Sequence, residues 1–294
     1  MSLQIVQGGG VQRLLLGGVM LASWLVFAGC IQTASDSVVP ETASTPTVTA
    51  RLGYWRPQKT GDLRIGTRSI TGTSTDLERT FDIEDQDGLV YSADLRFGRF
   101  GIDASFFELK HDGFQRLDRE LSFRGQTFAA GTDVDTNLDL NIATAHLRGD
   151  LLGAGPIALG PKVGLNYLNG YADVNTTTVA ESKQFDEFFP VVGGFVHCGV
   201  DLSESWRAFG DFEATGVGGS VGGVTGHFFD GQVRLGVQAA MVQFGVGYRH
   251  VDLAVERSRI NFEHDFTLSG PMLFIAIALG APREPHTSLT QVAE

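Results

Sequence analysis

The chain has 294 residues, among them 38 glycines and 21 phenylalanines, and only 19% of its residues are charged. Its formal charge of -12 argues against a nucleic-acid partner, because phosphate backbones are bound by basic surfaces. Its two cysteines provide no disulfide framework and no cysteine-rich metal site, so we expect neither a metal nor a cofactor. A mean hydropathy of +0.04 is too polar for a bundle of membrane helices.

The amino terminus has the form of a secretory signal peptide. An apolar run from Leu14 to Phe27 follows the single charge of Arg13, and it is shorter than the roughly 20 residues of a stable membrane-spanning helix. The segment from Phe27 to Cys30 resembles a bacterial lipobox, although the family usually has leucine where this chain has Phe27. The resemblance implies lipid attachment at Cys30; the alternative is an ordinary cleavage nearby with Cys30 as a bystander.

Composition divides the chain into four parts. Residues 1–30 form the signal peptide, and residues 31–47 form a linker rich in serine, threonine and proline with nothing to pack. Residues 48–280 carry the strand pattern described next, and residues 281–294 form a polar tail.

From Val48 onward the dominant pattern has a period of two, the spacing that places successive side chains on opposite faces of a sheet. In the segment 89–97 an apolar stripe alternates with Ser92, Asp94 and Arg96. The same alternation recurs in segments 157–167, 206–214, 229–237 and 242–249. We predict ten strands, at 48–56, 88–98, 99–110, 139–151, 156–169, 189–202, 205–216, 228–238, 240–253 and 268–280.

Charged side chains of both signs fall in mid-strand on the face opposite the apolar stripe. In a closed barrel that face is the lumen, where the charges pair with one another while the apolar face meets lipid. A soluble sandwich with the charges in solvent is the alternative. The predicted lumenal charge network comprises Asp94, Arg96, Asp103, Lys162, Asp201, Arg207, Asp211, Glu213, Asp230, Arg234 and Arg249.

The lengths of the connections give a second criterion. Five wide connections alternate with four tight ones, the latter at Gly98-Arg99, near Gly153, at Ser203-Glu204 and around Ala240. Outer-membrane barrels have short periplasmic turns, long external loops and an even number of strands. The sequence therefore predicts an all-β protein, a closed antiparallel up-and-down transmembrane β-barrel of about ten strands, with eight as the alternative, and with both termini in the periplasm.

Three segments carry a resemblance to the small outer-membrane barrels of the OmpA, OmpX and OmpW type: GLVYSADLRFGRFGIDASFFELK, GPKVGLNYLNGYADV and SGPMLFIAIALG. The resemblance covers residues 48–280 and implies a place in the bacterial outer membrane, with lipid, lipopolysaccharide and the barrel assembly machinery as partners. Such barrels usually end on an aromatic residue, whereas here Leu279 is followed by a polar tail.

Catalytic and cation sites are weakly indicated. His250 and Asp252 are the nearest approach to a base with its orienting acid, but no His-x-Ser pair of the deacylase kind accompanies them, so we expect a pair at the loop rim and no catalytic residue. The oxygen-rich segment 82–88 lacks the further spacing of an EF-hand loop, and we expect a solvated acidic loop there. Cys198 alternates with valines and is expected to face lipid.

The predicted function is that of a non-enzymatic outer-membrane barrel with a structural or surface-interaction role, acting through long external loops around a lumen plugged by charges. Three alternatives stay open: a narrow channel for small solutes, an enzyme that modifies lipid A, and a lipid-anchored soluble barrel that binds an apolar ligand. The last requires the apolar stripes to point inward.

Overall fold

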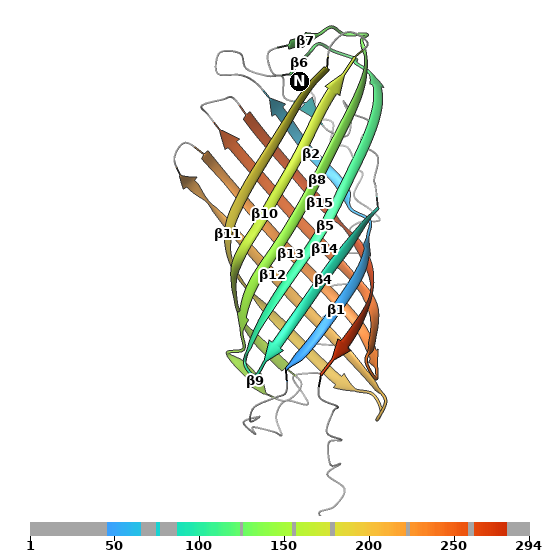
Figure 1. Cartoon of the computed structure of the whole chain (residues 1–294), viewed down its shortest axis with the longest axis vertical. Helices are drawn as coiled ribbons and strands as arrows, with labels where there is room; N and C mark the ends of the chain where they lie inside the picture. The colour runs from blue at the N-terminus through green and yellow to red at the C-terminus, as the bar shows by residue number, and fades with distance from the viewer. Residues whose placement is uncertain are drawn as a thin grey trace, which may run out of the picture.

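A computed structural model shows the chain as a closed barrel, longer than it is wide, with strongly tilted strands (Figure 1). The structure describes residues 46–65, 75–76, 87–123, 126–154, 157–176, 180–221, 224–257 and 262–280. The predicted signal peptide, its lipobox, most of the acidic segment 82–88 and the polar tail lie outside these residues. Within them, no helix is long and apolar enough to cross a membrane.

The wall is a single antiparallel meander in which each strand pairs with the next along the chain. Its strands are β1 (Thr47–Trp55), β2 (Gln58–Ile65), β4 (Gly88–Phe97), β5 (Phe100–Arg116), β8 (Asp133–Gly149), β10 (Ile157–Asn175), β11 (Ala180–Asp201), β12 (Trp206–Val221), β13 (Val224–Ala239), β14 (Val242–Arg257) and β15 (Phe262–Leu279). Four short strands lie in the connections at the ends of the barrel: β3 (Thr75–Asp76), β6 (Leu121–Phe123), β7 (Gln126–Phe128) and β9 (Leu152–Ala154).

The first and last strands close the barrel. β15 pairs with β1 along one part of its length, and with β2 along the rest. β1 and β2 are therefore one wall strand, interrupted at Arg56 and Pro57, because proline has no backbone N–H for the ladder. Arg56 still donates its backbone N–H to the carbonyl of Pro271 at 3.1 Å. Counted in this way the wall has ten strands, which confirms the predicted closed up-and-down barrel.

The two ends of the barrel differ. Tight connections lie at the end where β1 begins and β15 finishes, which we name the turn end; it is the lower end in Figure 1. Gly98 adopts a positive φ of 60° in the first of these turns, as a two-residue hairpin requires, and Ala240 has a φ of 50° in the last. The opposite end, which we name the loop end, holds the connection with β6 and β7.

The strands run further toward the loop end than predicted. β5, β8 and β10 to β15 each extend by several residues into segments predicted to be external loops. The prediction of long loops is therefore wrong for the connections β10–β11, β12–β13 and β14–β15, whereas the connections from β2 to β4 and from β5 to β8 remain long. The connection between β10 and β11, for example, spans residues 176–179 and not 170–187. The strands continue there because their apolar side chains change from the outward to the inward face.

In the lower half of the barrel, next to the turn end, large apolar side chains point outward. They include Val48, Leu52, Ile102, Leu147, Val163, Leu165, Phe212, Phe244, Val246, Leu273, Ile275 and Ile277, each more than 40% exposed. The inward positions between them carry charged and polar groups. The apolar stripes thus face lipid, as the sequence predicted, and the soluble barrel with an apolar lumen does not fit this half.

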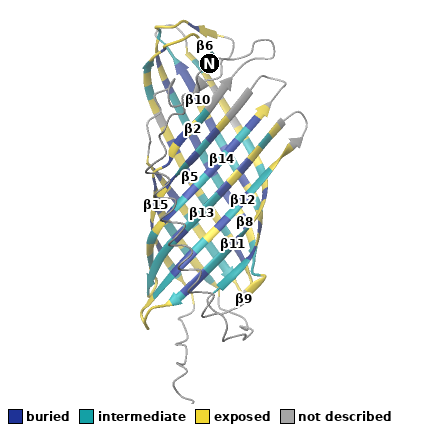
Figure 2. Cartoon of the chain, turned by 180° about the vertical axis from the view of Figure 1, so that it is seen from behind, coloured by how far each residue is buried: buried dark blue, intermediate teal, exposed yellow. Residues whose placement is uncertain are grey.

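In the upper half, toward the loop end, the arrangement is reversed. On β14, Phe244 and Val246 point outward, but Val251, Leu253 and Val255 point inward and are at most 2% exposed. β10 shows the same change between the outward Leu165 and the inward Leu168. Buried and exposed residues alternate along the strands in both halves (Figure 2), so the alternation never stops; only the apolar face changes.

A core of apolar side chains therefore fills the upper lumen. Its fully buried members include Trp55, Phe107, Ile142, Leu168, Val251 and Leu253. Outside the same wall, Tyr54 and Tyr167 lie with their hydroxyls donating to Asp87 and Asp186 respectively. Tyrosines whose rings follow an apolar surface and whose hydroxyls meet acids are typical of the boundary between hydrocarbon and water.

Candidate functional site in the barrel lumen

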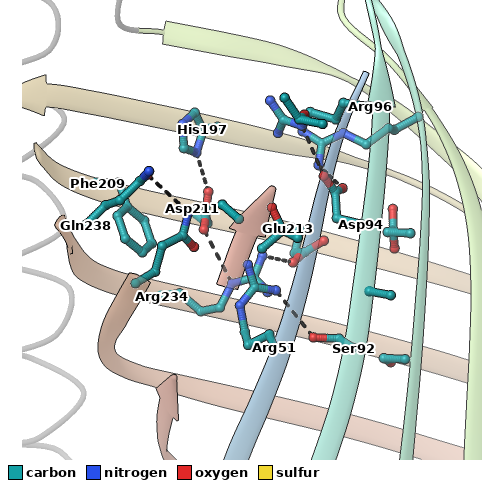
Figure 3. A pocket seen from close by; sticks show the side chains of 18 of the residues that line it. Arg51, Ser92, Asp94, Arg96, His197, Phe209, Asp211, Glu213, Arg234 and Gln238 are labelled. Atoms are coloured by element: carbon teal, nitrogen blue, oxygen red, sulfur yellow. Dashed lines mark hydrogen bonds and ion pairs between the residues drawn. The ribbon is translucent and has the colours of Figure 1, made fainter. Parts of the chain in front are cut away.

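The lower lumen holds a cavity of about 680 Å³. Thr47, Ser205, Met241 and Gly280 line it at the turn end, so its mouth lies where the chain enters and leaves the barrel. Deeper in, the wall is formed by inward side chains of β1, β4, β5, β8, β10, β11, β12 and β13. Figure 3 shows several of these side chains.

The apolar core closes the cavity toward the loop end. At the junction, Arg249 is 1% exposed and binds Asp230 through two hydrogen bonds of 3.0 and 2.6 Å. Its guanidinium lies 4.4 Å from the ring centre of Phe107 and 5.4 Å from that of Trp55. A cation held by a bidentate carboxylate and two aromatic rings is well satisfied without water, so it forms a dry floor for the cavity.

Lys162 and Glu213 form the centre of the ionic network. The Nζ of Lys162 donates to Asp103 at 3.0 Å and to Glu213 at 2.5 Å, and all three side chains are at least four-fifths buried. Arg234 donates to the other oxygen of Glu213 and lies 3.5 Å from Asp211. Each ion therefore has at least two partners, which is the condition under which burying charges is tolerated.

Two histidines extend this network. His197 Nδ1 lies 2.5 Å from the carboxylate of Asp211, which it shares with Arg234 (Figure 3). His146 uses both ring nitrogens, because Nδ1 lies 2.9 Å from Asp103 and Nε2 lies 2.9 Å from the side-chain oxygen of Asn166. His146 is thus fixed by its partners, and a His–Asp pair alone does not define a reaction.

A second cluster surrounds Asp94 near the mouth. Arg96 lies 3.3 Å and Arg148 3.2 Å from its two carboxylate oxygens. The guanidinium of Arg148 also stacks 3.8 Å from the ring centre of Phe195. This contact holds Arg148 against the wall by a cation–π interaction.

The structure places all eleven residues of the predicted charge network on the lumenal face. Nine line the cavity directly; Arg249 forms its floor, and Asp201 lies 3.9 Å from Arg207 at the turn end. The prediction that these charges plug the lumen is wrong. Because the ions pair with neighbouring or next-but-one strands, they stay against the wall, and the apolar core above them closes the barrel.

Sequence reasoning missed several residues of this site: Arg51, His146, Arg148, Asn166 and His197. The signal that could have found them is the same alternation, since Arg51 falls between the outward Ala50 and Leu52, and Arg148 follows the outward Leu147.

The pair His250 and Asp252 does not form a catalytic arrangement. Asp252 binds His227 at 3.0 Å and Thr267 at 3.1 Å, and the ring of His250 lies 6.0 Å from that of Phe229. These side chains lie on the outer surface of strands, not at a loop rim. Among the residues that the structure describes, no group of three histidine, cysteine or acidic side chains is placed to hold a metal ion. Cys198 lies on the outward face but is completely covered.

Comparison with known proteins supports the fold alone. No protein-family model matches the chain, and no curated protein matches it. Among solved structures, the outer membrane protease OmpT from Escherichia coli is similar with a TM-score of 0.53 and 9% identity, over 83% of this chain and 99% of that one.

Two further structures share less of the geometry. The attachment invasion locus protein Ail of Yersinia pestis, solved with a heparin analogue, has a TM-score of 0.37 and 10% identity, over 80% of this chain and 99% of that one. The toluene transporter TodX of Pseudomonas putida has a TM-score of 0.26 and 8% identity, over 79% of this chain and 89% of that one.

The closed ten-strand wall, the lipid-facing apolar exterior and the ionic lower lumen define the class of protein. The chain has the fold of an outer-membrane β-barrel.

Proposed function

We propose that this barrel does not conduct solutes and that it has a structural or surface-interaction role, without enzymatic activity. The observation that carries the proposal is the apolar core of the upper lumen. Trp55, Phe107, Ile142 and Leu168 are completely buried inside a closed wall, and close-packed apolar interiors leave no path for water or ions.

The surface of the upper half supports the interaction role. Most of its outward side chains are polar, and most of the charged ones are acidic, among them Glu108, Asp139, Asp186 and Asp252. Such a surface is stable in water and unstable in hydrocarbon, so we infer that the upper half stands clear of the membrane. In this proposal the upper wall, together with the connection that holds the β6–β7 hairpin, forms the exposed region.

The absence of conduction is tested in planar bilayers. We expect the refolded full-length protein to give no steady conductance, because the core blocks the lumen. The parallel control is a detergent blank, and folding is checked by a shift in mobility between unheated and boiled samples. A reproducible ohmic step at low voltage would refute the sealed barrel and favour the narrow channel.

We propose further that the turn end lies in the periplasm, where a lipid on Cys30 would tether the chain, and that the loop end is extracellular. Lys110 is exposed on the upper wall, and Leu202 is exposed in a turn at the opposite end. A membrane-impermeant maleimide is expected to label Lys110→Cys in intact cells, and Leu202→Cys only after the outer membrane is permeabilised. The unmodified protein is the control for the native cysteines, and the reverse labelling pattern would overturn the orientation.

A further inference from the structure

We propose that the lumenal cavity is a binding site for a small oxyanion, a carboxylate or a phosphate, anchored by Arg51 and entered from the turn end. The inference goes beyond the proposed function, since a sealed barrel needs no ligand site. It rests on the balance of donors and acceptors in the cavity wall.

Each carboxylate of the lumenal wall has at least one cationic or histidine partner, although Oδ2 of Asp103 is buried without a hydrogen-bond partner. Asp94 binds two arginines, Asp103 binds Lys162 and His146, and Asp230 binds Arg249. Asp211 is held by His197 and Arg234, and Glu213 by Lys162, Arg234 and Gln232. Each of these acids is therefore already neutralised by a neighbour.

Arg51 differs from the other cations of the wall. Among the residues that the structure describes, no carboxylate oxygen lies within ion-pair distance of it. Its Nη1 donates to the hydroxyl of Ser92 at a long 3.4 Å, and its Nε is buried with no hydrogen-bond partner. The guanidinium lies 5.6 Å from the ring centre of Phe274, which holds its position without satisfying its N–H groups.

A second arginine has spare donors. Arg148 binds Asp94 through Nη1, whereas its Nε and Nη2 are buried with no partner. The charged side chains that line the cavity balance, with six cations and six carboxylates: Arg51, Arg96, Arg148, Lys162, Arg207 and Arg234 against Asp94, Asp103, Glu204, Asp211, Glu213 and Asp230. The cavity is thus neutral overall in a chain whose formal charge is -12, and the N–H groups of Arg51 and Arg148 are its main unpartnered donors.

These features fit an oxyanion better than a cation or a neutral molecule. A guanidinium N–H that is buried without an acceptor is costly, as at Nε of Arg51, and a planar carboxylate or a phosphate presents two oxygens that match guanidinium N–H groups. The hydroxyl of Ser92, which accepts from Arg51, can also donate its own hydrogen to the same anion (Figure 3). A cavity of about 680 Å³ has room for a small organic acid or phosphate ester together with water.

The test is equilibrium binding to the full-length barrel refolded in a zwitterionic detergent. Inorganic phosphate and succinate are titrated separately at constant ionic strength against chloride, with calorimetry or the temperature of the mobility shift as readout. We expect at least one of the two to bind and to raise that temperature, and the one that binds identifies the ligand class. Binding of neither would overturn the proposal.

Variants locate the site. Arg51→Gln is expected to weaken binding about tenfold or more, as the loss of a charge-assisted contact implies, and Arg51→Lys, which keeps the charge, is expected to weaken it less. The matched control is Arg116→Gln, an exposed arginine near the loop end, which is expected to bind like the wild type. If Arg51→Gln does not refold, the affinity of Arg51→Lys is used instead. An affinity equal to that of the wild type in a folded variant would refute Arg51 as the anchor. Loss of binding in Arg116→Gln would refute a lumenal site.

Discussion

The two halves of this barrel are built from the same strands, yet their inward and outward faces are exchanged. In the lower half Val163 and Leu165 face outward while Lys162 is buried inside; in the upper half Leu140 and Ile142 are buried inside while Asn141 faces outward. The wall is continuous, so the backbone does not cause the exchange. What differs is the medium outside, since hydrocarbon selects apolar side chains and water selects polar ones.

The difference also separates two kinds of lumen. Below, ions meet in pairs around open space; above, apolar side chains fill the space completely. The upper half behaves like the core of a soluble barrel, stabilised by burial of apolar area, whereas the lower half depends on mutual satisfaction of its charges. Mutations should therefore have opposite effects in the two halves.

The largest effect is expected from a charge placed in the upper core. Leu140→Lys buries an unpaired ammonium and should cost about 4 kcal/mol or more of unfolding free energy. Asn141→Lys, one residue along, points outward opposite Glu108 and should change stability by less than about 0.5 kcal/mol. Urea unfolding in lipid vesicles measures both; equal destabilisation by the two variants would contradict the exchange of faces.

Removal of one ion from the lower lumen comes next. Lys162→Met leaves Asp103 and Glu213 each short of one partner and should cost about 3 kcal/mol. The same substitution in the upper half, Lys110→Met, breaks a 2.9 Å pair with Glu108 that is exposed to water, and should have no measurable effect. The comparison is made by urea unfolding at low and high salt. A salt-sensitive loss of unfolding free energy in Lys110→Met, with none in Lys162→Met, would contradict the view that the lumenal ions stabilise the barrel and the exposed pair does not.

A smaller effect is expected from a charge placed on the lipid side. Val163→Lys points into hydrocarbon next to the inward Lys162 and should cost about 2–3 kcal/mol, with slower insertion into vesicles. Folding kinetics in vesicles follow the insertion, and Val163→Ile is the control for altered packing. A variant that inserts at the wild-type rate with unchanged stability would show that Val163 does not face lipid.

The sequence was sufficient for much of the fold. Strict alternation in segments such as 89–97, together with the tight turns at Gly98 and at Ser203, predicted the closed ten-strand meander and the lipid-facing stripes correctly. The upper ends of the strands do not follow from the apolar stripe, because the apolar side chains change face within each strand. On β14 the apolar residues change from even to odd positions after Tyr248, and in the sequence alone this change resembles the end of a strand.

The candidate site was only partly predictable. The eleven charges predicted to face the lumen lie there because side-chain direction follows from the period of two, a local property of any strand. Their partners were not predictable, since Lys162, Asp103 and Glu213 are separated by about 50 residues or more and meet only when the wall closes. The environment of Arg51 was not predictable either, because whether a carboxylate lies within ion-pair distance of it depends on neighbours from several strands.

The sequence alone thus determined that this chain is a ten-strand barrel whose strands have one apolar and one charged face, because the alternation of side chains is a local property of the sequence. Only the tertiary structure decided that the lumen is a cavity below and a sealed core above. That outcome depends on which distant side chains share the interior at each height, and closure of the barrel brings them together.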